Sequence, residues 1–383
     1  MGRQEQISMI RERKKETKTD TVLLILVLLL AVFGLVMLFS ISEYNGRVRF
    51  GDSACYFKKQ LFATALGMGV MYMVSSIDYH FFLRLGPVAY LISMFLSGAV
   101  LFVGQEINGS KRWLNLGPLS FQPSEFAKVA VILFLAWQIE RTKKATMGFG
   151  FMCRTILTLL PIIGLVGSNN LSTAIIVMAI TVLLLFLVHP KTKRFVVFAC
   201  VVLVLAVIVV VYLKIQISDM ATSTDFRMRR IIAWLNPEAN SDKDSYQFLQ
   251  GLYAIGSGGF FGKGLGNSTQ KLSAIPEAQN DMILTVICEE LGVFGAILIL
   301  CLFGFMLYRL MFIARNAPDL YGSLIAAGIF SHIALQVILN IAVVTGLIPT
   351  TGVTLPFISY GGTAVVFLLA EMGIALGISS KIE

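Results

Sequence analysis

Long apolar segments alternate with short polar segments along this chain of 383 residues. The runs TVLLILVLLLAVFGLVMLF (21–39) and FVVFACVVLVLAVIVVVYL (195–213) each approach the roughly 20 apolar residues that one membrane crossing requires. These runs are continuous rather than alternating, which favours helices over a β-barrel. The pattern predicts an all-α, polytopic membrane protein of about ten transmembrane helices. We expect spans near 21–42, 60–77, 86–104, 124–139, 152–168, 171–188, 195–215, 282–306, 323–345 and 362–379.

Charged residues are scarce, since 56% of the chain is hydrophobic and 14% is charged. Soluble proteins are about 45–50% apolar and about 25% charged. The basic clusters are RERKK (11–15), ERTKK (140–144), HPKTKR (189–194) and YRLMFIAR (308–315), while the opposite loops hold Arg47, Arg49, Lys58, Lys59, Lys111 and Arg112. Basic loops stay on the cytoplasmic side, so we expect both termini there. The net charge of +9 therefore reflects topology and does not indicate nucleic-acid binding.

No small-residue cleavage site follows the first apolar run, so we expect it to be a retained anchor. Residues 1–20 then form a cytoplasmic tail. One long extracytoplasmic loop, about 216–281, separates the seventh and eighth predicted spans, and loops of such length are usually functional. Within it, residues 246–259 have the amphipathic pattern of a helix that lies on the membrane or dips into it.

The predicted start of the fourth span carries an acid and a base one turn apart. Pro123 precedes Glu125, and Lys128 follows with the spacing that places both charges on one helix face. Together with Lys111 and Arg112 these residues form either an interfacial anchor with a local ion pair or a cationic cradle for an anionic headgroup.

Two segments of the long loop have the composition of a phosphate site. Arg227 and Arg230 share a helix face, where they could touch anionic lipid or bind phosphate oxygens. The glycine-rich segment 256–271 lacks a preceding strand and the G-K-[ST] signature, which excludes a P-loop. Its glycines could admit a pyrophosphate, act as a hinge or belong to a plain flexible loop.

Carboxylates mark the entry to the eighth predicted span. Glu277 and Asp281 are four residues apart near the membrane boundary, where partial burial can tune a carboxylate for general-base work. Deeper in the same helix, Glu289 and Glu290 require buried partners. The pattern leaves a functional role and a structural ion pair open for these two acids.

The segment 340–364 interrupts apolar sequence with two prolines and four glycines between the last two spans. Broken backbone at membrane depth must be buried in protein or line a cavity. We expect a re-entrant cavity wall with a polar lining of Asn340, Thr350, Thr351, Ser359 and Tyr360, although a tight connection remains the alternative. The scattered cysteines and histidines have no metal-site spacing.

These segments, in this order, resemble the SEDS family (shape, elongation, division, sporulation) of bacterial cell-wall synthesis, and within it the FtsW and SpoVE branch. The matching stretches are GSKRWLNLG, QPSEFAK, FRMRRIIAWLNP, GKGLGNSTQK, IPEAQND, EELG and GLIPTTGVTLPFISYGGT, which run through nearly all of the chain from residue 105 onward. The resemblance implies a single transmembrane domain over 21–383 in the bacterial cytoplasmic membrane, with its active site on the outer face.

The activity implied by the resemblance is a peptidoglycan glycosyltransferase that polymerises lipid II during division or spore-wall synthesis. Asp281 falls at the family's catalytic aspartate and would deprotonate the acceptor hydroxyl. We expect the substrate to meet Arg112, Glu125, Lys128, Arg227, Arg230, Asn267, Lys271, Glu277 and Ser359, with the basic residues near the pyrophosphate.

The implied partners are a class B penicillin-binding protein, which is a transpeptidase, membrane lipid and other divisome or spore-wall proteins. No nucleic acid is expected. A divalent cation, Mg²⁺ or Mn²⁺, is compatible with carboxylates beside a pyrophosphate, but no ligand spacing demands one.

The sequence departs from the family pattern at three places. PEAHTD reads PEAQND, Pro-Asp-x-Gly-Thr reads Asn169-Asn170-Leu171-Ser172-Thr173, and SYGGSS reads SYGGTA. The second change removes an aspartate, so no role of that aspartate is carried over. Two other functions stay open: a lipid II flippase, which broken helices and intramembrane charges also fit, and a non-catalytic scaffold for a synthase.

Overall fold

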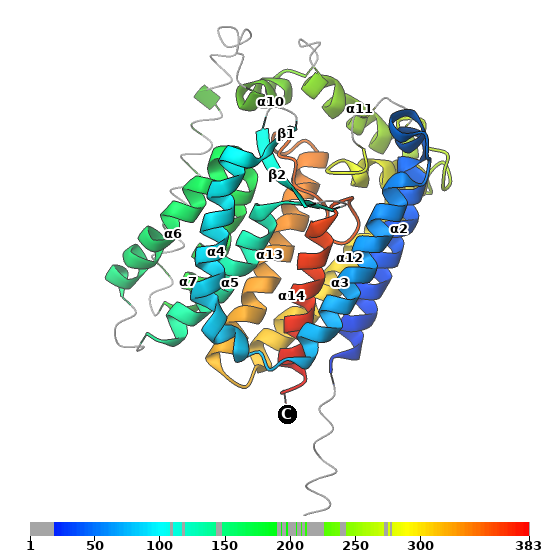
Figure 1. Ribbon diagram of the computed structural model, residues 1–383. Coiled ribbons are helices and arrows are strands. Elements are labelled where there is room, and N and C mark those ends of the chain that lie inside the picture. The colour runs from blue at the N-terminus through cyan, green and yellow to red at the C-terminus, as the bar shows by residue number, and fades with distance from the viewer. Residues whose placement is uncertain are drawn as a thin grey trace, which may run out of the picture.

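The structure is a computed structural model that describes residues 19–107, 110–116, 119–142, 148–189, 226–237, 243–271 and 278–382, with isolated positions at 193, 197, 204, 208, 211, 212 and 275. Its long helices are α2 (Thr21–Phe50), α3 (Cys55–Ser76), α4 (Phe81–Val103), α5 (Pro123–Glu140), α6 (Phe149–Asn169), α7 (Leu171–Val188), α12 (Ile283–Asn316), α13 (Leu320–Val344) and α14 (Thr363–Ser379). They run side by side as one bundle (Figure 1).

The predicted all-α membrane fold is confirmed. Nine of the ten predicted spans correspond to helices in the described part of the chain, and the span predicted at 195–215 lies almost entirely outside it. Among the described helices, α2, α4, α6, α7, α12 and α13 are long and apolar enough to cross a membrane. Two helices extend beyond the prediction, because α2 continues to Phe50 and α12 to Asn316 with polar residues in their last turns.

The centre of the bundle consists of α5, α13 and α14. On one side α3 packs along α14 and α2 along α12, while on the other side α4 packs along α5 and α6 along α7. Glycines allow the closest of these approaches: a Cβ added to Gly373 of α14 would lie 2.6 Å from the Met71 carbonyl oxygen of α3. Small residues at such contacts are typical of membrane helices, where packing rather than water exclusion holds helices together.

One end of the bundle is capped by short elements (Figure 1). An antiparallel sheet of β1 (Gln105–Ile107), β2 (Ser110–Leu116) and β3 (Leu119–Phe121) connects α4 to α5. Beside it lie α10 (Phe226–Leu235) and α11 (Lys243–Gly258), which belong to the predicted long loop. The helix expected at 246–259 is therefore present as α11. The chain ends at the opposite end of the bundle.

The backbone departs from helical geometry in two places that shape this capped end. α12 breaks at Gly292, which has φ 70° and ψ −171°. The connection between α13 and α14 is irregular over 345–362, with positive φ angles at Gly346, Gly352, Phe357 and Gly362. Non-helical backbone in the predicted segment 340–364 is thus confirmed.

Candidate active site

A cavity of about 370 Å³ lies at the capped end of the bundle, where β2, β3 and α10 contribute to its lining. Its walls come from the sheet, the N-terminal turns of α5 and α7, α10, α13 and the irregular segment 345–362. The lining residues are Arg49, Tyr56, Arg112, Trp113, Ser120, Gln122, Glu125, Lys128, Asn170, Thr173, Ile176, Arg230, Gln279, Asn280, Asp281, Gln336, Gly352, Val353, Thr354, Tyr360, Gly361, Gly362 and Ala364. Segments far apart in the sequence therefore build one polar chamber at this end of the bundle.

Asp281 lies in this cavity just before α12 begins at Ile283. Asn340 of α13 fixes its backbone, because Asn340 Nδ2 donates to the Asp281 carbonyl oxygen at 2.9 Å and to that of Val353 at 2.8 Å. The Asn340 side chain is completely buried. One amide thus ties the turn that carries the aspartate to the irregular segment that forms the opposite wall.

The Asp281 carboxylate and the Arg230 guanidinium both approach Gly352. A Cβ built on Gly352 would lie 3.9 Å from Asp281 Oδ2 and also 3.9 Å from Arg230 Nη1, and Gly352 has a φ of +74°. Arg230 Nη1 donates to the Thr350 carbonyl oxygen at 3.5 Å, and Trp234 Nε1 donates to that of Gly346 at 2.7 Å. These contacts dock α10 onto the irregular segment and place a cation close to the acid.

Positive charge predominates in the lining. Among the lining residues that the structure describes, four basic side chains, Arg49, Arg112, Lys128 and Arg230, meet two acidic ones, Glu125 and Asp281. Fixed cations in a partly enclosed site stabilise an anionic group more strongly than they would in water. The cavity therefore suits a ligand with negative charge.

Two of these basic residues are held firmly. Lys128 Nζ lies 2.9 Å from Glu125 Oε2, and the side chains are only 1% and 9% exposed. The local ion pair, which was one of the two alternatives left open for this cluster, is therefore formed. Arg112 Nε donates to the Asn169 carbonyl oxygen at 2.7 Å, which aims the rest of the guanidinium group at the cavity.

The structure brings together five of the residues predicted for the site: Arg112, Glu125, Lys128, Arg230 and Asp281. Glu277 lies outside the described residues, as does the side chain of Arg227, whose backbone belongs to α10. The other predicted residues are not among the cavity-lining set. Asn267 Nδ2 donates to the Lys263 carbonyl oxygen, and Ser359 Oγ accepts from the Leu355 amide at 2.8 Å.

Of the polar lining predicted for the segment 340–364, Tyr360 faces the cavity. Asn340, Thr350, Thr351 and Ser359 are not part of the lining, and Asn340 acts instead through the backbone bonds described above. Arg49, Tyr56, Thr173 and Gln336 were not predicted for the site. Gln336 could have been found, because an amide in the middle of an apolar helix is itself a signal.

Lys271 belongs to a different arrangement, formed by the strap, which we define as residues 259–271. Its Nζ lies 2.8 Å from Glu290 Oε1 and 3.1 Å from Ser40 Oγ. Lys263 Nζ lies 2.6 Å from Glu289 Oε1, and Ser268 and Thr269 also donate to Glu289. Of the two roles left open for Glu289 and Glu290, the structure shows the buried ion pairs, and the lysine partners come from the strap.

The strap also completes the backbone of α12 at its break. The Lys263 and Gly264 amides donate to the Glu289 and Glu290 carbonyl oxygens, each at 2.9 Å, and the Val293 amide donates to the Gly259 carbonyl oxygen at 3.0 Å. Groups that a broken helix would leave unpaired thus find partners in the strap, as buried backbone requires.

Among the described residues, no group of three or more His, Cys, Asp or Glu side chains is arranged to hold a metal ion. Asp281 and Glu125 are the acidic side chains in the lining, and Glu125 is engaged by Lys128.

Comparison with known proteins matches residues 20–383 to the family model of FtsW, RodA and SpoVE, described as "Cell cycle protein". The chain belongs to this family, the SEDS family. Stage V sporulation protein E of Bacillus subtilis is 38% identical over 369 residues, covering 95% of this chain and 98% of the relative. "Probable peptidoglycan glycosyltransferase FtsW" of the same species is 36% identical over 384 residues, covering 97% and 93%.

Two solved structures share the fold. One, described as "Structural coordination of polymerization and crosslinking by a peptidoglycan synthase complex", has a TM-score of 0.75 at 28% identity and covers 94% of this chain and 97% of its own. The crystal structure of the rod shape determining protein RodA of Thermus thermophilus has a TM-score of 0.66 at 26% identity, covering 94% and 96%.

Proposed function

We propose that this SEDS protein is a peptidoglycan glycosyltransferase that polymerises lipid II at the membrane surface. The observation that carries the proposal is the placement of Asp281 beside Arg230 in a cation-rich cavity at one end of an apolar helix bundle. Membrane-embedded walls suit a substrate with a lipid tail, and the basic lining suits its diphosphate.

Asp281 would act as the general base. Its carboxylate takes the proton from the acceptor sugar hydroxyl as that oxygen bonds to the anomeric carbon of the donor. The bond from that carbon to the lipid diphosphate oxygen breaks, and the diphosphate leaves with the bonding electrons. A positioned base contributes roughly 10²–10⁴-fold to such a step.

Arg112 and Arg230 would stabilise the charge that develops on the leaving diphosphate. Glu125 neutralises the charge of Lys128. We therefore expect Lys128 to shape the cavity and to contribute less than a full positive charge to it. Asn340 would hold the backbone of Asp281 in a fixed position relative to the irregular segment that carries Gly352.

The capped end of the bundle would face the outside of the cell, with both termini in the cytoplasm. The basic clusters of the sequence support this orientation. A class B penicillin-binding protein would crosslink the product, in keeping with the complex named for one of the solved SEDS structures. Membrane lipid and other divisome or spore-wall proteins complete the proposed surroundings.

A divalent cation such as Mg²⁺ or Mn²⁺ stays a prediction. Asp281 and the amide oxygens of Asn280 and Gln279 are oxygen donors in the lining that could complement a substrate diphosphate. A bound cation would supply further charge neutralisation at the leaving group. Activity that is lost in EDTA and restored by Mg²⁺ or Mn²⁺ would support it, and full activity in EDTA would remove it.

The flippase alternative receives less support from the geometry. The large cavity and its charged lining lie at one end of the bundle, whereas alternating access requires a site that opens to each face in turn. A transferase needs only one open face.

The test is glycan polymerisation from lipid II by the purified protein with its transpeptidase, comparing the native chain with Asp281→Asn. Asp52→Asn is the matched control, because Asp52 is a solvent-exposed acid outside the cavity that pairs with Lys58. We expect polymer from the native chain and the control, and a loss of at least about 10²-fold for Asp281→Asn. Equal activity of the two variants would remove Asp281 as the base. Protein-dependent transfer of lipid II across vesicles without polymer would favour the flippase.

A further inference from the structure

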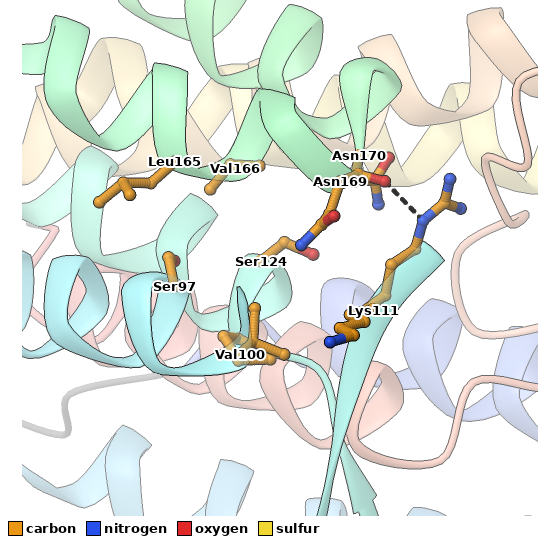
Figure 2. Close-up of a pocket in the computed structure, with 10 residues that line it drawn as sticks. Ser97, Val100, Lys111, Ser124, Leu165, Val166, Asn169 and Asn170 are labelled. Atoms are coloured by element: carbon orange, nitrogen blue, oxygen red, sulfur yellow. Dashed lines mark hydrogen bonds between the residues drawn. The ribbon is translucent and has the colours of Figure 1, made fainter. Parts of the chain in front are cut away.

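A second, much smaller cavity adjoins the candidate active site and shares Arg112 and Asn170 with it. Its volume is about 20 Å³. Figure 2 shows its lining, which comes from α4, β2, α5 and α6. One water needs about 10–15 Å³. The small cavity therefore has room for one water molecule or one monatomic ion, and it is too small for a phosphate group.

Three buried polar atoms of the lining have no hydrogen-bond partner within the part of the chain that the structure describes. They are Ser97 Oγ, Ser124 Oγ and Asn169 Nδ2. The serine side chains belong to residues that are 2% and 8% exposed. Buried polar groups almost always have a hydrogen-bond partner. Three buried polar atoms without one around a single small cavity therefore indicate that the cavity holds a bound species.

The lining offers donors and positive charge rather than acceptors. An amide nitrogen can only donate, and a hydroxyl can donate. The nearby carbonyl oxygens of Val100 and Val166 already accept from the Gly104 and Asn170 amides, at 2.9 Å and 2.8 Å. Lys111 and Arg112 are among the described lining residues, and no carboxylate is.

Helix polarity acts in the same direction. Ser124 lies in the first turn of α5, where the helix dipole favours negative charge. We propose that the small cavity is a site for a monatomic anion, chloride in the cell, held by Ser97, Ser124 and Asn169.

The site has a direct connection to the large cavity. The Asn169 carbonyl oxygen accepts from Arg112 Nε at 2.7 Å, while the side chain of the same residue faces the small cavity (Figure 2). An anion bound to the Asn169 amide would therefore fix the residue that orients Arg112. This consequence for Arg112 rests on the proposed function, whereas anion binding itself does not.

The first experiment measures the Tm of the purified protein in sodium chloride, sodium bromide and sodium gluconate at equal ionic strength. A ligand that binds the folded state raises Tm in a saturable way. We expect a higher Tm in both halides than in gluconate, and no such difference in the Ser97→Ala/Ser124→Ala double variant. Ser93→Ala is the matched control, because Ser93 is buried one turn earlier on α4 and its hydroxyl donates to the Tyr90 carbonyl oxygen at 2.9 Å.

Equal Tm values of the native protein in halide and gluconate would overturn the proposal, as would a halide effect that persists in the double variant. If the double variant does not fold, crystals of the native protein in bromide decide the question. An anomalous peak within hydrogen-bond distance of Ser97, Ser124 and Asn169 supports the anion, and a water without anomalous signal overturns it. Neither measurement uses catalysis, so its outcome is separate from that of the polymerisation assay.

Discussion

The Nζ atom of Lys271 lies 2.8 Å from Oε1 of Glu290, where the two side chains are 8% and 0% exposed. Removing one partner of such a pair leaves a buried charge without compensation, which is destabilising by about 3–5 kcal/mol. We expect Lys271→Met to lower the free energy of unfolding by that amount, measured by denaturation in detergent micelles.

A solvent-exposed ion pair with the same nitrogen–oxygen distance provides the comparison for the effect of burial. Lys58 Nζ is also 2.8 Å from its acid, Asp52 Oδ2, but these side chains are 66% and 44% exposed. Exposed pairs are screened by water and contribute little to stability, so Lys58→Met should change the free energy of unfolding little. Equal losses for Lys58→Met and Lys271→Met would contradict the role of burial.

The break in α12 requires glycine. A Cβ on Gly292 would lie 2.3 Å from the Phe260 carbonyl oxygen, and its φ of +70° is strained for any other residue. We expect Gly292→Ala to be destabilising by several kcal/mol, since steric strain at such a φ adds to the displacement of the strap. Gly304 in the same helix has open space around its Cβ position, so Gly304→Ala should be neutral or slightly stabilising. Thermal unfolding measures the difference, and coinciding unfolding curves for Gly292→Ala and Gly304→Ala would contradict the requirement for glycine at position 292.

Asn340 should be a positioning residue for Asp281. Asn340→Ala removes both hydrogen bonds that connect the Asp281 and Val353 carbonyl oxygens. We expect kcat for glycan polymerisation to fall about 10²-fold, because a displaced base loses its alignment, with a smaller change in KM. Asn316→Ala removes a hydrogen bond to Phe312 at an exposed site and is the control. A KM effect alone would point to substrate binding instead.

The stability of the protein should depend on pH through His80, which lies at the end of the bundle opposite the cavity. Its Nδ1 lies 2.8 Å from Asp78 Oδ1 and its Nε2 lies 2.6 Å from Asp319 Oδ2. Partial burial lowers the pKa of the imidazole, but hydrogen bonds and charge from the two aspartates more than offset it, so the pKa lies above its ordinary 6.5. The same contacts, first the hydrogen bond from the His80 amide, lower the pKa of Asp78, and Lys381 adds to this effect.

A raised histidine pKa stabilises the folded state fully below about 6.5, and this contribution is lost as the pH rises through the raised value. We therefore expect the Tm difference between native protein and His80→Asn to shrink as the pH rises from 6 towards 9. Because the His80 side chain is 52% exposed, the effect should be about 1 kcal/mol or less. A Tm difference that is constant over this range would exclude the protonated ring, and Tyr79, which donates to Asp319, would then be the remaining contact of interest.

The helices could be predicted because unpaired backbone groups and charges are costly in lipid. Each membrane-spanning helix therefore needs a long apolar run, which the hydropathy pattern reveals. The pair Glu125–Lys128 could be predicted because its members lie one turn apart on one helix. Local spacing decides both features, and neither depends on how distant segments meet.

The role of Lys271 could not be predicted from local spacing. Its charge and its glycine-rich surroundings suggested a substrate contact, but Glu290 engages it after the strap folds against α12. Arg49 shows the reverse case, because hydropathy marks where a helix leaves the lipid and not where it ends. α2 continues to Phe50 and carries Arg49 to the cavity. The strands of the cap are short and pair through contacts that no sequence period reveals.

The interlocking of the strap with the broken α12 has a consequence for exchanging parts between relatives. Residues 259–264 and 289–294 complete each other's backbone hydrogen bonds, and a Cβ at Gly262 would lie 2.2 Å from the Glu290 carbonyl oxygen. A stretch grafted alone into a relative loses the pair Lys263–Glu289 or Lys271–Glu290 wherever the host lacks the matching partner. Chimaeras should therefore carry 258–294 as a single cassette, and natural recombination within this interval should be selected against.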